Sequence, residues 1–430
     1  MSGTRVMQRV VVTGMGIVSC LGNSLDAVSR ALREGRSGVT RIDAWRERGF
    51  HSQVAAAATV ADEPPFSRKL ERFMGDTARF ACHAAKKAID DARLDDATLR
   101  SPKTGAVIGS GVGAMAEYDV AIAAVRAHGI DRAPPYTIPR AMSSTASANV
   151  VQTFGIEGVA YSPSSACTTS ALAIGQAMQL IQTGRQHVVL AGGSEALHDN
   201  MTLMFDAMHA LSRAFNDTPA RASRPYDTAR DGFVIGSGAG VLVLESLDHA
   251  LARGARIYAE LTGFGESTDG AGMVTPHSGG IARALRMALD EAGESPEYVN
   301  TQAPSTPLGD AEELRALRDV FGARVPPFSS TKGMTGHPLG ACGAHEAIYT
   351  LLMMRDGFIA GTGRIEFPDP LVQGMPLVQA TREARIDRAM SVSFGFGGSC
   401  ASLMFKKFDR CPSAQVTGVN RLTTKVMEEE

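Results

Sequence analysis

Apolar runs alternate with segments of helical periodicity along most of the chain. The strand-like runs are residues 9–16, 105–113 and 187–193. The helix-periodic segments are residues 25–34, 80–94, 116–127, 167–183 and 345–355. Strands and helices in alternation predict an α/β fold. Residues 41–70 are irregular and mixed in charge, so we expect a surface insertion there.

The second half of the chain repeats features of the first in the same order. The matching segments are 13–16 with 262–265, 88–92 with 288–292, and 233–243 with 393–404. Three pairs of similar segments in the same order favour a duplicated β/α unit over chance similarity. We therefore expect an N-terminal half at 1–254, a C-terminal half at 255–410, and a polar, flexible tail at 411–430.

Composition narrows the classes of function. The 430 residues have a formal net charge of −2, so no basic field is available for nucleic acid or an acidic membrane surface. No apolar run approaches the length of a membrane span. The six cysteines lack paired C-x-x-C spacing, which argues against a zinc site or a disulfide framework and fits the reducing cytoplasm. We expect neither a metal nor a redox cofactor, because ligand clusters and a complete dinucleotide fingerprint are missing.

One cysteine stands where a helix is predicted to begin. Cys167 follows Pro163 and two serines, and an alanine-rich, helix-periodic segment comes after it. The helix dipole and free backbone N–H groups at that position favour a thiolate, and so a nucleophile. A small core residue in a tightly packed helix is the alternative interpretation.

A nucleophilic cysteine needs a partner that handles a proton or polarises a carbonyl, and the candidates lie in the second half. His337 lies in a Gly-His-Pro turn, Lys332 precedes it by five residues, and Glu346 follows on a predicted helix. Glu346 could hold either of the other two as a supporting carboxylate. A turn histidine bonded to backbone and a solvated lysine are the alternatives, and spacing alone does not decide.

Four motifs together resemble one enzyme family. They are Ser164-Ser165-Ala166-Cys167, Arg224-Pro225-Tyr226-Asp227 with Arg230-Asp231-Gly232-Phe233, Lys332-x-Met334-Thr335-Gly336-His337, and Ser393-Phe394-Gly395-Phe396-Gly397-Gly398. From Val10 to about Lys407 the chain resembles a β-ketoacyl-acyl-carrier-protein synthase of the elongating class. The resemblance implies an α/β, thiolase-like fold whose duplicated β/α halves pack as a layered α/β/α/β/α core.

The resemblance also implies roles for individual residues. Cys167 would accept an acyl chain from an acyl carrier protein as a thioester, with its N–H and that of Phe396 forming the oxyanion hole. His337 would donate a hydrogen bond to the second thioester substrate, organised by Lys332 and Glu346. The remaining assignments are Phe396 as a gate, Gly111 and Val112 in the acyl pocket, Thr306 at the pantetheine arm, and Asp310 and Glu313 as acidic family positions that could equally be surface or capping residues.

One departure from the family pattern limits what carries over. Where the family has His-Gly-Thr-x-Thr-Pro, this chain has Gln302-Ala303-Pro304-Ser305-Thr306-Pro307, so Gln302 replaces the first catalytic histidine and Pro304 replaces a threonine expected at the pantetheine. Gly398-Ser399-Cys400 likewise alters a Gly-Thr-Asn-like segment. A glutamine amide can donate a hydrogen bond but cannot act as a base near neutral pH.

Three functions follow as hypotheses. The first is a Cys-His-Gln ketosynthase that condenses acyl-Cys167 with a malonyl-type thioester, with phosphopantetheine arriving on the carrier protein. The second is an acyltransferase to an oxygen, nitrogen or other carbon nucleophile, without decarboxylation. The third is a catalytically reduced subunit of a heterodimer. The family implies a dimer, and the retained Cys167, Lys332 and His337 argue against the third hypothesis.

Overall fold

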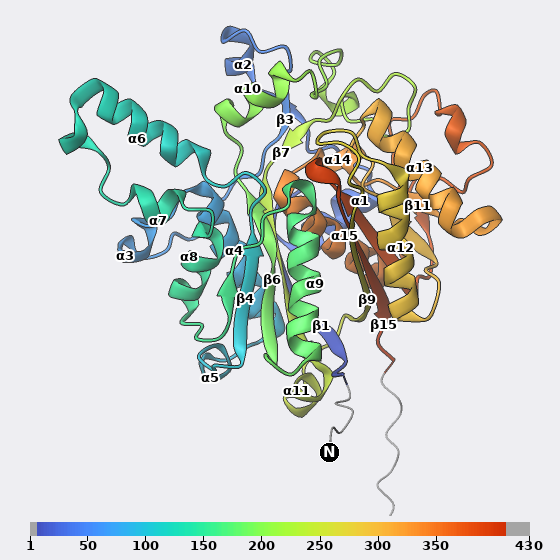
Figure 1. The fold of residues 1–430 in the computed structure, drawn as a ribbon, viewed down its shortest axis with the longest axis horizontal. Coiled ribbons are helices and arrows are strands. Elements are labelled where there is room, and N and C mark those ends of the chain that lie inside the picture. The colour runs from blue at the N-terminus through green and yellow to red at the C-terminus, as the bar shows by residue number, and fades with distance from the viewer. Residues whose placement is uncertain (1–6, 410–430) are drawn as a thin grey trace, which may run out of the picture.

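One mixed sheet organises the computed structural model, which describes residues 7–409; the tail expected at 411–430 lies outside the described residues. Its ten strands run in the order β11-β10-β14-β15-β9-β1-β8-β6-β4-β5 (Figure 1). They are β1 (Val10–Val18), β4 (Thr104–Gly109), β5 (Ala160–Tyr161), β6 (Val188–Glu195), β8 (Gly238–Ser246), β9 (Ala259–Thr268), β10 (Tyr298–Asn300), β11 (Phe328–Ser329), β14 (Arg388–Phe394) and β15 (Ser399–Lys407).

The sheet consists of two equivalent halves. Reading inward from each edge, β5-β4-β6-β8-β1 has the same sequence of parallel and antiparallel pairings as β11-β10-β14-β15-β9. The halves join where β1 pairs antiparallel with β9, at Val10–Val12 against Ala259–Leu261. The repeated segments 13–16 and 262–265 lie in the equivalent strands β1 and β9, and 88–92 and 288–292 lie in equivalent helices, as a duplicated β/α unit requires. The segments 233–243 and 393–404 correspond only in β8 and β15, because Ile235–Gly236 belongs to a separate small sheet.

Helices complete the layers on both sides of each half. On β1 and β8 lies α4 (Asp76–Ala92), and on β9 and β15 lies α12 (Ser278–Ala292). Between the halves, α9 (Thr169–Gln182) and α15 (Cys342–Asp356) pack against each other. On β8, Leu242 and Leu244 face the α9/α15 core while Val241 and Val243 face α4, which is the alternation expected of a strand covered on both sides.

Close helix–strand contact explains why the repeated sequence contains glycines. A Cβ added at Gly16 would stand 1.9 Å from the carbonyl oxygen of Ala84 in α4, and one at Gly265 would stand 1.9 Å from that of Ala284 in α12. Both strands thus need glycine where the helix backbone approaches. Each half therefore contains one such contact, in which a strand glycine packs against a helix backbone.

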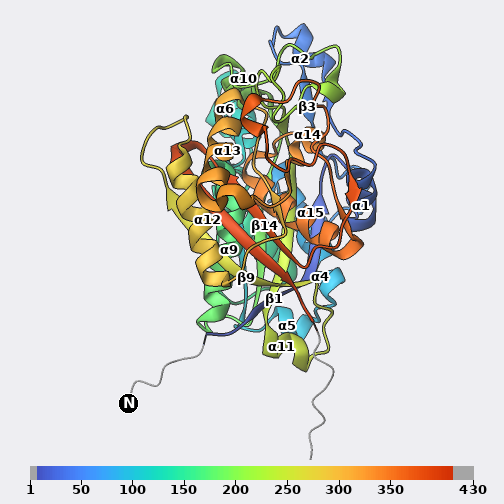
Figure 2. The same ribbon diagram turned by 90° about the vertical axis from the view of Figure 1, so that its right-hand side faces the viewer.

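The other elements surround this core. The further helices are α1 (Leu25–Arg33), α2 (Asp43–Glu47), α3 (Arg68–Glu71), α5 (Asp96–Leu99), α6 (Met115–His128), α7 (Thr137–Ala141), α8 (Thr145–Phe154), α10 (Asp199–Ala207), α11 (Leu247–Ala252), α13 (Pro307–Phe321) and α14 (Lys332–Thr335). Two small sheets combine β2 (Thr40–Arg41), β3 (Val54–Ala56) and β7 (Ile235–Gly236), and β12 (Phe358–Ile359) and β13 (Arg382–Glu383). In Figure 2, α1 and α12 lie on opposite sides of the molecule.

The segment 41–70 lies largely at the surface, as its composition suggested, but it also contributes a short buried strand. All three residues of β3 are buried, and this strand pairs parallel with β7. Trp45 and Phe50 are also buried, with their rings stacked 5.6 Å apart. The prediction missed these buried pieces because β3 is ordered by β7, which pairs Ile235 with Ala55 from far along the chain. Gly236 of β7 in turn donates a backbone hydrogen bond to His337 O, so this segment supports the candidate site.

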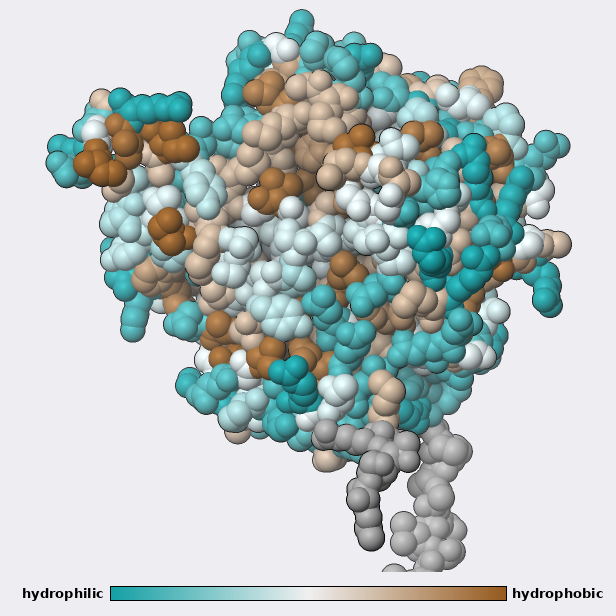
Figure 3. Space-filling view, in the orientation of Figure 1, coloured by the Kyte–Doolittle hydropathy of each residue, from teal (hydrophilic) through white to brown (hydrophobic). Residues whose placement is uncertain are grey.

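An arm projects from the first half. Helix α6 extends to the left of the body in Figure 1 and has no buried residue. Apolar side chains gather on it in Figure 3. The exposed apolar residues of α6 and the segment that follows it are Tyr118, Val120, Ile122, Ile130, Tyr136 and Ile138.

Candidate active site

The turn that carries Cys167 is held by its own hydroxyl groups. Residues Ala166–Thr168 form a 3₁₀ turn, and α9 begins at Thr169, so the predicted helix start is displaced by two residues. Ala166 has a left-handed φ of 51°. The hydroxyl of Thr168 donates to Ser165 O at 2.7 Å, and Ser165 N donates to the Thr169 hydroxyl at 2.9 Å. The hydroxyl-rich motif thus stabilises a strained turn that presents Cys167 to a cavity.

His337 is the direct partner of this cysteine. Its Nε2 lies 3.0 Å from Cys167 Sγ. Backbone bonds fix the residue, since His337 N donates to Val234 O at 2.8 Å and Gly236 N donates to His337 O at 3.0 Å. The ring of Phe233 packs edge-on against the imidazole at 5.4 Å. Burial, aided by the charge of Lys332, lowers the pKa of His337 well below its usual value, so the imidazole is neutral.

The thiol of Cys167 is protonated in the resting site. Burial raises its pKa to about 12, and the opposing effects of Lys332 and of the Phe396 backbone N–H are smaller. Removal from water therefore opposes the thiolate expected at a helix start, because it raises the pKa of Cys167 more than the favourable contacts lower it. Cys167 and His337 form a neutral pair in which a proton can pass from sulfur to Nε2.

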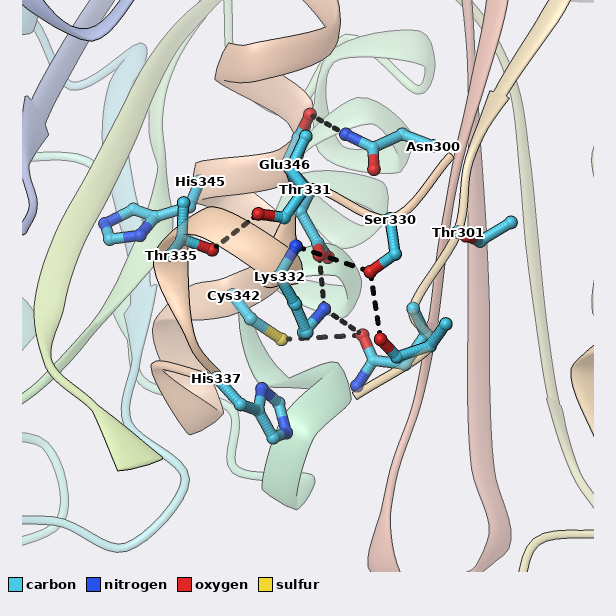
Figure 4. Close-up of polar contacts among 12 residues, drawn as sticks. Asn300, Thr301, Ser330, Thr331, Lys332, Thr335, His337, Cys342, His345 and Glu346 are labelled. Atoms are coloured by element: carbon cyan, nitrogen blue, oxygen red, sulfur yellow. Dashed lines mark hydrogen bonds and ion pairs between the residues drawn. The ribbon is translucent and has the colours of Figure 1, made fainter. Parts of the chain in front are cut away.

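A buried ion pair lies beneath His337. Lys332, at the start of α14, and Glu346, on α15, bind each other directly and are 1% and 2% exposed (Figure 4). Burial would lower the pKa of Lys332, but the attraction of Glu346 raises it, so the lysine is charged. The ion pair therefore supplies a fixed positive charge behind the cavity wall.

This lysine fixes the orientation of Gln302. Lys332 Nζ donates to Gln302 Oε1 at 2.9 Å, and Gln302 Nε2 donates to Phe394 O at 3.0 Å. Because an ammonium only donates and a carbonyl only accepts, both contacts assign the same end of the amide to nitrogen. Nε2 keeps one further N–H, and Gln302 lines the cavity.

Two buried carboxyl groups hold the loop that contains Gln302. Glu313 accepts hydrogen bonds from Gln302 N and Ala303 N, each at 2.8 Å. Asp310 accepts from Ser305 N at 3.1 Å. Both acids are fully buried, so neither is a surface residue. Burial raises the pKa of Glu313 to about 8 and that of Asp310 to about 6.

The predicted residues meet at one apolar cavity of about 410 Å³. Those that line it are Cys167, His337, Gln302, Phe396, Gly111, Val112, Pro304 and Thr306. Lys332 and Glu346 lie behind the wall, where Lys332 is bonded to Gln302 and its charge lowers the pKa of His337. The structure thus brings together every site residue selected from the sequence, from both halves of the duplicated fold.

Aromatic side chains connect Phe396 to the histidine. The ring of Phe396 lies 6.2 Å from that of Phe205, which lies 5.3 Å from Phe233, the residue that contacts His337. Phe396 is half-buried, in a 3₁₀ turn at the cavity. Movement of this ring would change access to Cys167.

Comparison with known proteins identifies the family. The model for the N-terminal domain of beta-ketoacyl synthase matches residues 7–250, and the model for its C-terminal domain matches residues 258–366. The chain belongs to the beta-ketoacyl synthase family. It is 45% identical to 3-oxoacyl-[acyl-carrier-protein] synthase 1 of Haemophilus influenzae, over 94% of this chain and 100% of the relative. The Escherichia coli K12 synthase of the same name is also 45% identical, over 93% and 99%.

Solved structures show the same fold in other beta-ketoacyl synthases. A Burkholderia phymatum beta-ketoacyl synthase has a TM-score of 0.89 at 36% identity, covering 94% of this chain and all of that one. The ketosynthase of a type II polyketide system, solved in complex with its acyl-carrier protein, has a TM-score of 0.86 at 29% identity, with the same coverage. The expected thiolase-like α/β fold is thereby confirmed.

Two residues of this beta-ketoacyl synthase site were missed from the sequence. The thiol of Cys342 donates to Cys167 O at 3.0 Å and lies 3.8 Å from Gln302 Oε1. Glu195, at the end of β6, is buried beside the acyl-pocket loop. An acidic residue directly after an apolar strand was a signal for Glu195, whereas nothing in the sequence distinguished Cys342.

Within residues 7–409, no helix is long and apolar enough to cross a membrane.

Proposed function

We propose that this chain is a condensing β-ketoacyl-acyl-carrier-protein synthase that works with a Cys-His-Gln set. The observation that supports it most directly is the placement of three groups at one apolar cavity: the Cys167 thiol, the His337 imidazole 3.0 Å from it, and the Gln302 amide oriented by Lys332. A nucleophile with a proton acceptor, next to separate donors, suits acyl transfer followed by carbon–carbon bond formation.

The first half-reaction loads the acyl chain. As Cys167 Sγ attacks the carrier thioester carbon, its proton passes to His337 Nε2 and then to the departing pantetheine sulfur. The backbone N–H groups of Cys167 and Phe396 would hold the oxyanion. The products are acyl-Cys167 and the free carrier thiol. A neutral cysteine–histidine pair suits this step, because proton transfer and attack occur together.

The second half-reaction extends the chain. A malonyl-type thioester loses CO₂, and the resulting enolate carbon attacks acyl-Cys167 to give a β-ketoacyl-carrier product and the Cys167 thiolate, which takes up a proton from water. The enolate oxygen needs hydrogen-bond donors as charge develops on it. The remaining Nε2–H of Gln302 would donate to it, and the positive charge of Lys332 at Gln302 Oε1 strengthens the amide as a donor. Acyl loading leaves the neutral imidazole of His337 with its proton on Nδ1, so His337 would donate to the enolate after shifting to the tautomer that carries the proton on Nε2.

Gln302 is proposed to stand in place of the family's first catalytic histidine. Its position in the segment Gln302–Pro307, before α13, supports this correspondence. Because an amide does not act as an acid or a base near neutral pH, Gln302 would stabilise the enolate without activating water. A non-decarboxylating acyl transfer is therefore the second candidate function.

The partners are proposed from the cavity and the family. An acyl carrier protein would deliver its phosphopantetheine arm past Thr306 and Pro304, both of which line the cavity. We propose that no metal or redox cofactor takes part, because thioester exchange and decarboxylation need neither.

We also propose a dimer. The edge strand β5 is exposed at both residues, and the arm formed by α6 presents apolar side chains without an intramolecular partner surface. A second copy, or a homologous subunit, would cover both. Sedimentation of the purified chain separates these cases. A homodimer sediments at twice the chain mass, whereas a purified chain that stays monomeric would indicate that the partner is a different subunit.

One assay tests the reaction. The purified protein is incubated with an acyl-carrier protein and then with malonyl-carrier protein, while mass spectrometry follows Cys167 acylation, CO₂ and product. We expect acyl-Cys167 and a product longer by two carbons. Acylation without CO₂ would contradict condensation and favour transfer to another nucleophile. No acylation at all would favour a catalytically reduced subunit.

A further inference from the structure

A buried carboxylate connects two loops that border the cavity. Glu195 is 0% exposed at the end of β6. Its Oε2 accepts hydrogen bonds from Gly111 N at 2.8 Å and Gly340 N at 3.0 Å. Its Oε1 accepts from the Ser110 hydroxyl at 2.7 Å and from Val112 N at 3.3 Å.

We propose that Glu195 is a positioning residue that holds the acyl-pocket loop, Ser110–Gly113, against the turn that follows His337. The four donors come from these two segments alone, and four is the number that an ionised carboxylate can accept. Three are backbone N–H groups, an arrangement typical of a backbone anion site, which here is occupied by a side chain of the same protein.

The two loops pack closely, and the Glu195 carboxylate fills the space between them. A Cβ added at Gly340 would stand 2.2 Å from Gly111 N and 2.8 Å from Glu195 Oε2. A Cβ added at Gly111 would stand 2.9 Å from Glu195 Oε2 and 3.0 Å from Ala166 O. The carboxylate thus lies directly behind the residue that precedes Cys167. It fixes the cavity wall that Gly111, Val112 and Leu339 form.

The charge of Glu195 also acts on the nucleophile. Burial raises the pKa of Glu195, while its four hydrogen bonds oppose this change. Among residues 7–409 no lysine or arginine forms an ion pair with it, and the groups that lower its pKa are hydrogen-bond donors. That negative charge raises the pKa of Cys167, alongside burial. Lys332, Glu346, His337 and Cys342 also face this thiol and are unchanged in the test below.

Glu195→Gln is the central variant. The Ser110 hydroxyl can reverse and accept from the new amide, but Val112 N loses its acceptor and the charge is removed. Amide hydrogen exchange followed by mass spectrometry should show segment 110–113 exchanging about tenfold faster, the effect of losing one hydrogen bond. Alkylation of Cys167 by iodoacetamide should shift to lower pH by about one pH unit.

Glu245→Gln is the matched control. Glu245 is also a fully buried carboxylate, bonded to Thr13, His249 and Arg253 at the opposite end of the β6/β8 pair. Its replacement should lower stability without changing the Cys167 alkylation profile or exchange at 110–113. Gly340→Ala pushes the loops apart while the charge is retained, so exchange should rise with no shift in alkylation.

The outcomes separate this inference from the proposed function, on which it rests for the identity of the acyl pocket. Neither exchange nor alkylation needs an acyl substrate, so both remain informative even if the protein does not condense. Wild-type exchange and a wild-type alkylation profile in a folded Glu195→Gln protein would overturn the inference. If Glu245→Gln changed exchange and alkylation equally, both effects would reflect a general loss of stability, and the inference would be overturned as well.

Discussion

Lys332 Nζ donates to Gln302 Oε1 at 2.9 Å, and with the bond from Gln302 Nε2 to Phe394 O this contact fixes which end of the amide carries the N–H groups. In the other orientation Gln302 would present only a carbonyl oxygen to the cavity and could not stabilise an enolate. A buried lysine, itself held by Glu346, therefore turns an amide into an oriented donor.

Gln302→Glu tests that donor with almost no change of shape. The carboxylate still accepts from Lys332 but has no N–H for the substrate, so condensation should fall about 10²- to 10³-fold, as for other oxyanion donors. Formation of acyl-Cys167 should change much less. Mass spectrometry of acyl-enzyme and product measures both steps. Gln302→His is the control: a sharp rise in decarboxylation would show that the native glutamine restrains it.

The ion pair beneath the site should be needed for activity more than for folding. Lys332→Met leaves Glu346 buried without its cation, which should cost about 3–5 kcal/mol in the free energy of unfolding. The double variant Lys332→Met with Glu346→Leu should recover most of that stability yet stay inactive, because Gln302 loses its orienting donor. Urea unfolding and the condensation assay report the two effects. Recovery of activity in the double variant would contradict the role given to Lys332.

Glu313 should make stability fall with rising pH. Burial raises its pKa to about 8, above that of the unfolded chain, so its contribution is complete at low pH and is lost as pH rises toward 8. The slope should not exceed about 1.4 kcal/mol per pH unit for this group. The histidines with lowered pKa, which are His83, His187, His337 and His345, titrate below pH 6.5, so the window from pH 6.5 to 8 reports mainly on the acids. Urea unfolding of Glu313→Gln should show a flatter dependence there, and an unchanged slope would exclude Glu313 as its source.

Equivalent glycines in the two halves should respond alike to substitution. Gly16→Ala and Gly265→Ala each place a Cβ 1.9 Å from a helix carbonyl oxygen, so each should destabilise the protein by about 1–3 kcal/mol through overpacking. Thermal or urea unfolding measures the change. A large loss in one half and none in the other would show that the two helix–strand contacts are not equivalent.

The sequence showed the duplication, because repeated glycine patterns reflect a local steric need that each half meets separately. The residues that line the cavity with Cys167 were selected through motifs that resemble a family, while Cys342 and Glu195 were missed. The buried strand within segment 41–70 was also missed, because β3 is ordered by β7 and no local pattern records that pairing.

Only the tertiary structure decided the state of the site. Whether Cys167 is a thiol or a thiolate depends on how far it is removed from water, and burial set by both halves outweighs the opposing effects of Lys332 and the Phe396 N–H. The amide orientation of Gln302 depends on Lys332, thirty positions later, and the wall behind the nucleophile depends on Glu195, which reaches both loops from a third element. Sequence determines which chemical groups are present, whereas distances and burial, which determine their protonation and direction, arise only when distant segments pack together.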